Sequence, residues 1–123
     1  MKFIQWALYD TPRSLSVAKN FYSELATQGN SHAQYMLGFM YSTGIGVPQR
    51  DLAKGLLYYT FAALGGDIAS DMTLGYWYHQ GIGVSKSCDD GVEWYRRAAK
   101  QGNYYFNYYF SFFFISFFVK SLI

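Results

Sequence analysis

Apolar positions along this chain follow the period of an α-helix. Between residues 31 and 43, Ala33, Leu37 and Tyr41 follow one another at four-residue steps and therefore share one helix face. Gly, Pro and Asp residues stand at the ends of this and similar stretches, where helices start and stop. We expect helices over residues 14–27, 31–43, 51–64, 68–80 and 89–100.

The helical stretches also repeat. Residues 37–47 return almost unchanged as residues 74–84, shifted by 37 positions. Residues 21–30 match residues 58–67 at the same shift, and residues 58–67 match residues 94–103 at a shift of 36. Self-similarity at a period of this size is typical of stacked repeat proteins. The sequence therefore predicts an all-α fold, an α-solenoid of antiparallel helix pairs with one half and two whole units.

Two glycines occupy equivalent positions inside the first helix of each pair. Gly38 and Gly75 each cost roughly 1 kcal/mol there relative to alanine. A cost repeated at an equivalent site predicts a compensating close approach of the neighbouring helix. The repeat-defining structural positions are Leu37, Gly38, Tyr41, Gly44, Gly46, Tyr59, Ala63, Leu74, Gly75, Tyr78, Gly81, Gly83, Tyr95 and Ala99. Their tyrosines are expected in the core.

The link after each first helix reads Gly-Ile-Gly-Val in both copies. We expect Gly44 and Gly81 to end these helices in the left-handed conformation. Ile45 and Ile82 are expected to fill the corner between the two helices of a pair.

The second helices have their own end signals. Asp51 and Asp89 are expected to cap or favour the amino ends. Gly29, Gly66 and Gly102 are expected to close the carboxyl ends in the manner of Gly44 and Gly81. Small residues recur near these ends and predict close helix packing; they are Ala26, Ala63 and Ala99.

The chain divides into three parts. Residues 1–13 have no clear pattern, and we expect no signal peptide there because Gln5 interrupts the apolar run and Asp10 closes it early. Residues 14–103 hold the repeats. Residues 104–123 are mostly Phe and Tyr. Three interpretations of this tail stay open, namely a membrane anchor, a packed terminal helix and a mispredicted exon.

Composition and motifs argue against catalysis, metal binding and nucleic-acid binding. A net charge of +2 without a basic stripe predicts no nucleic-acid partner. The single Cys88 excludes an internal disulfide and is expected to be a small apolar core residue. His32 and His79 lack partners at metal-ligand spacing, and the pair Asp89 and Asp90 reads as a solvated helix start. We therefore predict no catalytic, cofactor-binding or metal-binding residues, and a protein that is not an enzyme.

Positions that differ between the copies are candidates for partner binding. Met36 and Met40, with their counterparts Thr73 and Trp77, lie four residues apart on the first helices. An apolar strip of Met and Trp on the concave side of a solenoid suits protein partners. The alternative is that these side chains pack against the next repeat.

The spacing of these residues is similar to that of the Sel-1-like repeat family, the longer relative of the tetratricopeptide repeat. The residues that carry the resemblance are Ala33, Leu37, Gly38, Tyr41, Gly44, Gly46, Val47, Tyr58, Tyr59, Ala62, Ala63 and Gly66. Residues 57–66 and 81–88 most resemble the eukaryotic branch of the family, which includes the endoplasmic-reticulum adaptor of the Hrd-type ubiquitin ligase.

The resemblance implies a repeat scaffold in the lumen or membrane of the endoplasmic reticulum. Its implied partners are ubiquitin ligase subunits or misfolded client proteins, and its implied role is delivery to degradation. Two alternatives stay open: a cytoplasmic scaffold for signalling complexes, and a truncated product without independent function. Membrane contact through residues 104–123 is a further expectation. Residues 1–103 leave both stack ends uncapped, so we expect marginal stability or self-association.

Overall fold

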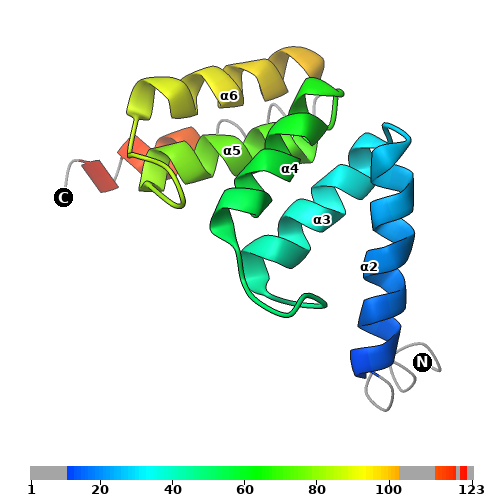
Figure 1. Cartoon of the computed structure of the whole chain (residues 1–123). Coiled ribbons are helices and arrows are strands. Elements are labelled where there is room, and N and C mark those ends of the chain that lie inside the picture. Colours follow the sequence, from blue (N-terminus) through cyan, green and yellow to red (C-terminus); the bar gives the residue numbers. More distant parts are fainter. Residues whose placement is uncertain (1–10, 103–112, 119, 122–123) are drawn as a thin grey trace, which may run out of the picture. The chain divides into compact units, whose positions relative to one another are not determined.

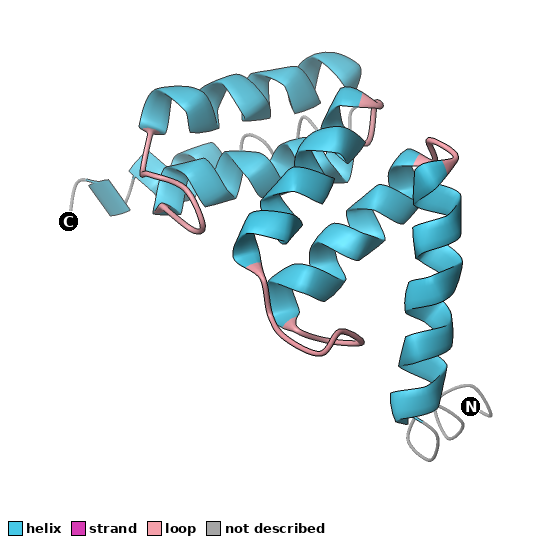
Figure 2. Cartoon of the chain, viewed as in Figure 1, coloured by secondary structure: helices cyan, strands magenta, loops and turns pink. Residues whose placement is uncertain are grey.

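The computed structural model describes residues 11–102, 113–118 and 120–121, and within these residues every regular element is a helix (Figure 2). The helices are α2 (Thr11–Thr27), α3 (Ser31–Thr43), α4 (Leu52–Leu64), α5 (Ile68–Gln80) and α6 (Cys88–Gln101) (Figure 1). The expected all-α fold is confirmed, and the five helices begin and end within three residues of their predicted bounds. The expectations for residues 1–10 and 104–112 lie outside the described residues.

The chain forms two compact units, Met1–Gly65 and Gly66–Ile123. In the first unit α3 packs against both α2 and α4, and in the second unit α5 packs against α6. The core cluster of the first unit is built from Ala26, Ala33, Leu37 and Met40.

Polar side chains cap four of the helices. Asn30, Asp51, Asp67 and Ser87 each accept a hydrogen bond from the backbone N–H three residues further on, at the starts of α3 to α6. Asp51 caps α4 as expected. Of the two roles expected for Asp89, the cap is provided by Ser87, whose hydroxyl accepts from the Asp90 N–H at the start of α6. Asp89 instead lies in the first turn, where its negative charge interacts favourably with the helix dipole.

The link between the two helices of a pair closes identically in both units. Gly44 and Gly81 have φ of 82° and 75°, so the predicted left-handed ends of α3 and α5 are confirmed. The Asp51 N–H then donates to the Tyr41 carbonyl, and the Ser87 N–H donates to the Tyr78 carbonyl, each at 2.8 Å. Tyr41 and Tyr78 are 37 positions apart, whereas Asp51 and Ser87 are 36 positions apart. The second copy is therefore one residue shorter than the first within this link.

The mid-helix glycines lie against tyrosine rings. A Cβ added to Gly38 would be 2.7 Å from Tyr59 Cδ1, and one added to Gly75 would be 2.7 Å from Tyr95 Cδ1. Both rings are buried, at 3% and 6% exposure. The predicted close approach is therefore confirmed in both units. Burial, with a smaller contribution from Tyr76, raises the pKa of Tyr95 to about 12.

A second pair of glycines completes this seam, and the repeat pattern did not single it out. A Cβ on Gly55 would lie 3.2 Å from the Gly38 carbonyl oxygen, and a Cβ on Gly91 would lie 2.9 Å from that of Gly75. Each helix pair therefore crosses glycine on glycine, with the tyrosine ring beside the crossing.

Some packing expectations were wrong. Ile45 is 44% exposed and Val47 packs against the core in its place, because the turn directs the isoleucine outward. Gly102 has φ of −77° and is extended, so it does not end α6 as a left-handed residue. Cys88 is exposed because the first turn of α6 presents it to solvent.

Burial among the expected core residues also varies. Tyr41 and Tyr78 are half-buried, whereas Tyr59 and Tyr95 are fully buried. In α6 the fully buried small residue is Ala98 and not Ala99. None of the described helices combines the length and the apolar character that a bilayer span requires.

Candidate functional site

The expected strip of Met36, Met40, Thr73 and Trp77 is largely packed inside the molecule. Met40 is 3% exposed and Trp77 is 7% exposed, while the other two are half-buried. The Met40 methyl group occupies the space beside Gly46 where a side chain would otherwise stand. The packing alternative accounts for the burial of Met40 and Trp77. Partner binding through these four residues stays a prediction.

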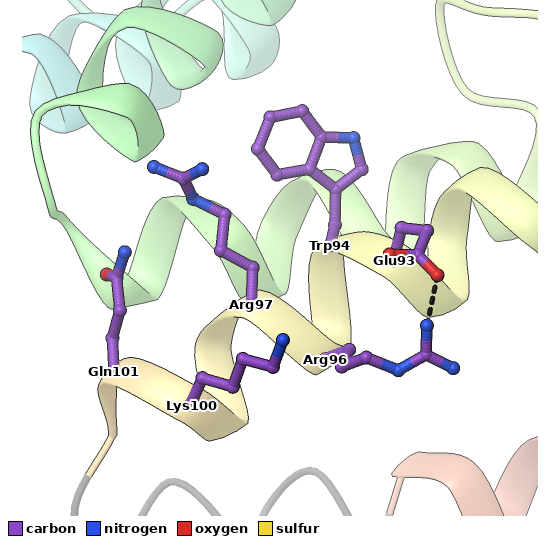
Figure 3. A pocket seen from close by; sticks show the side chains of 6 residues that line it. All are labelled: Glu93, Trp94, Arg96, Arg97, Lys100 and Gln101. Atoms are coloured by element: carbon purple, nitrogen blue, oxygen red, sulfur yellow. Dashed lines mark hydrogen bonds and ion pairs between the residues drawn. The ribbon is translucent and has the colours of Figure 1, made fainter.

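A different surface is hollowed and lined mainly by charged side chains. A pocket of about 520 Å³ lies along α6, and its described lining comes from that helix alone (Figure 3). The lining residues are Glu93, Trp94, Arg96, Arg97, Lys100 and Gln101. Three of these are cations and one is an anion.

The pattern of α6 explains why these side chains gather. Gly91, Tyr95 and Ala98 are spaced by three and four residues and form the buried face of the helix. Trp94, Arg97 and Gln101 fall on the flank of this face, and the other pocket residues fall on the exposed side of the helix. The sequence thus places a cationic, amphipathic helix over the core of the second unit.

Arg97 is held from below by a buried carboxylate. Its Nε lies 3.3 Å from Asp71 Oδ1 on α5, and Asp71 has no solvent exposure. Burial raises the pKa of Asp71 to about 6, although the Arg97 charge lowers it, and Asp67 raises it further. Neither carboxylate oxygen of Asp71 has a hydrogen-bond partner among the described residues.

The remaining contacts of the pocket are close to its surface. The Arg97 guanidinium lies 6.0 Å from the centre of the Trp94 ring, within cation–π range. Arg96 forms an exposed ion pair with Glu93, three residues earlier. No ion pair involves Lys100 among the described residues.

Sequence reasoning missed this site. Asp71 takes the place of Gln34 of the earlier copy, and its burial was not predicted. The position of Asp71 along its helix could have predicted this burial, because Asp71 shares a helix face with the core-facing repeat positions Leu74, Gly75 and Tyr78. A lone acid on an apolar face predicts a buried cationic partner, and Arg97 is that partner.

The corresponding face of α4 is apolar. Leu57, Phe61 and Leu64 occupy the repeat positions of Glu93, Arg97 and Lys100. All three are between 49% and 61% exposed. The cationic pocket is therefore a property of the second helix pair and not of the repeat in general.

The pocket is suited to binding. Its described lining supplies cations, an indole and an amide, and contains no Ser, Cys or His to act as a nucleophile or a neutral-pH base. No group of three metal-ligating side chains is found among the described residues. The groups present favour the binding of an anionic ligand that also carries an apolar part.

The described part of the tail contacts the second unit elsewhere. Phe113 stacks on Tyr95 with ring centres 6.3 Å apart, and Phe117 meets the His79 ring edge to face. Burial lowers the pKa of His79, and the charges of Lys86 and Lys120 lower it further. Among the three interpretations of the tail, these contacts fit a packed terminal helix.

Comparison with known proteins gives consistent matches. The Sel1 repeat family matches residues 31–67 and 73–103. The human protein sel-1 homolog 2 is 41% identical over 87 residues, which cover 71% of this chain and 12% of that protein, and the mouse protein of the same name matches equally. The chain thus spans about an eighth of the curated relatives it matches.

Two solved structures share the fold. A Sel1 repeat protein from Oxalobacter formigenes is 33% identical with a TM-score of 0.67, over 71% of this chain and 34% of that one. A protective antigen of uropathogenic Escherichia coli that displays an SLR fold is 34% identical with a TM-score of 0.68, over 74% of this chain and 19% of that one. The predicted solenoid of antiparallel helix pairs is confirmed by these neighbours.

Proposed function

Because the chain belongs to the Sel1 repeat family, we propose that it is a protein-docking scaffold without catalytic activity, and that it serves in the adaptor of an endoplasmic-reticulum ubiquitin ligase complex. In that role it contacts ligase subunits or misfolded client proteins and helps route the clients to degradation. Helical repeats suit this role because they offer extended surfaces to partners.

The observation that carries the proposal is the 41% identity to sel-1 homolog 2 over 87 residues. The matched length is close to that of the described repeats. Since it covers only 12% of that relative, the partners and the location of the whole protein are themselves part of the proposal.

The pocket on α6 supports docking in preference to chemistry. It combines cations with the half-buried indole of Trp94, and both are groups that contribute strongly to protein interfaces. Its described lining offers no nucleophile beside a base.

The direct test is localisation combined with co-purification. The natural gene product, carrying an epitope tag, is expressed in its own cells, and its protease protection in sealed microsomes is measured. We expect it to co-purify with a membrane ubiquitin ligase, and its depletion to lengthen the half-life of a misfolded luminal reporter. A folded cytosolic reporter serves as the control and is expected to be unaffected.

A tagged protein found in the cytosol without ligase subunits would favour the alternative of a cytoplasmic signalling scaffold. Transcript sequencing across the codons for Asn103 and Tyr104 tests the other alternative, a truncated product. A splice junction at that point, joined to further repeats in the main transcript, would assign the present sequence to a minor product.

A further inference from the structure

We infer that the α6 pocket binds an acidic segment of a partner protein, with carboxylates against Arg97 and Lys100 and an apolar side chain against Trp94. This inference rests on the proposed docking function and names the chemistry of the partner. The surface involved is distinct from the strip of Met and Trp residues expected from the sequence.

The charges of the pocket favour an anionic occupant. Three cations and one acid line it, and the acid, Glu93, is already joined to Arg96. Lys100 has no such partner among the described residues. A carboxylate arriving beside Lys100 therefore gains an ion pair without breaking one.

Asp71 prepares Arg97 for this role. The buried carboxylate contacts the Nε edge of the guanidinium, and the arginine side chain is still 37% exposed. Figure 3 shows Trp94 and Arg97 projecting to the same side of α6. Since Arg97 is already oriented by Asp71, less side-chain entropy is lost when a ligand binds. We therefore assign Asp71 as a positioning residue.

The surroundings favour a peptide over a nucleic acid. Polyanions bind along extended basic stripes, whereas this pocket is confined to one helix and has Glu93 at its edge. Trp94 offers an apolar surface that suits an aromatic or aliphatic side chain of the partner. An acidic peptide with one such side chain matches both features.

The experiment measures binding of a fluorescent peptide to the full chain. The probe is a short peptide rich in Asp and Glu with one Phe, and its twin carries Asn and Gln in place of the acids. We expect the acidic probe to bind and the amide twin to bind at least about tenfold more weakly, with affinity falling as salt rises.

Variants locate the site. Lys100→Gln should weaken binding of the acidic probe about threefold to fivefold, as expected for one exposed charge pair. Lys54→Gln is the matched control, because it removes one exposed lysine from α4, outside the pocket, and should leave the affinity unchanged. Trp94→Ala should weaken binding by more than about tenfold. Far-UV circular dichroism shows whether each variant keeps its helices.

Asp71→Asn tests the positioning role separately. It loosens Arg97 and also removes the negative charge beside its guanidinium, so the pocket becomes more cationic. The positioning role predicts weaker binding of the acidic probe in spite of that added positive charge, and tighter binding would overturn it. A purely structural role of Asp71 would lower stability without altering the affinity of the folded fraction.

The outcomes separate the two proposals. Equal binding of both probes, no binding, or equal effects of Lys100→Gln and Lys54→Gln would overturn the pocket assignment alone. Tighter binding of a single-stranded oligonucleotide than of the acidic peptide would also overturn it. If the tagged protein captures no ligase subunit while the pocket variants behave as expected, the adaptor role fails and the pocket stands.

Discussion

Substituting Gly75 by alanine tests the seam that joins the two helices of a pair. The added Cβ would lie 2.7 Å from both Cδ1 and Cε1 of Tyr95 and 2.9 Å from its Cγ. Contacts this short require the ring to move, and the ring is 94% buried between its neighbours. Overpacking of this kind costs about 1–3 kcal/mol.

The substitution also brings a gain that must be subtracted. Alanine is better than glycine inside a helix by about 1 kcal/mol. Three ring atoms lie within the clash distance, so we place the cost near the upper end of its range and expect a net loss of about 1–2 kcal/mol. For a chain of 123 residues, the midpoint of thermal unfolding should fall by about 4 °C for each kcal/mol.

The assay is urea unfolding of four proteins: wild type, Gly75→Ala, Tyr95→Leu and the double variant. Leucine leaves room for the new methyl group, so in the Tyr95→Leu background the alanine should be neutral or stabilising. The coupling energy between the two positions should therefore be about 1–3 kcal/mol. If Gly75→Ala stabilises the wild-type background, or costs the same in both backgrounds, the ring contact does not explain the repeated glycine.

Three further predictions concern the second unit. Burial raises the pKa of Asp71 from 3.8 to about 6, so the folded state holds this proton more tightly than the unfolded state. As the pH rises from about 4 to about 6, the free energy of unfolding of the wild type should therefore fall, by up to about 3 kcal/mol relative to Asp71→Asn, in paired urea titrations. Removing residues 104–123 should raise the pKa of His79 towards its ordinary value in NMR titrations, because part of the burial and the Lys120 charge that lower this pKa are lost. An unchanged pKa would contradict the contact between the tail and His79. The shortened chain should also self-associate in light scattering. Cys88, being exposed, should react with a thiol reagent in the native protein at a rate close to that of the unfolded chain, and strong native protection would contradict its placement.

The sequence was sufficient for the helices because local and repeat signals agreed. Two copies of one pattern fixed the period, and the glycines at equivalent positions predicted the close packing that Gly38 and Gly75 show against tyrosine rings. Such contacts recur in each copy, so comparison of the copies reveals them.

Features that occur in only one copy were harder to predict. Asp71 and Arg97 are 26 positions apart, and only the packing of α5 on α6 brings their side chains together. Exposure at element ends was also missed, because Cys88 and Ile45 depend on the direction in which one turn points its side chain. Composition and spacing contain little information about that direction.

The central claim is that the second helix pair docks protein partners through α6. NMR of the isotope-labelled full chain, titrated with the acidic peptide, tests it most directly. We expect the largest changes in chemical shift at the Trp94 indole N–H and at the backbone amides of residues 93–101, and no such changes with the peptide that carries Asn and Gln in place of the acids. Changes centred on α3 or α4, or none at saturating peptide, would contradict it.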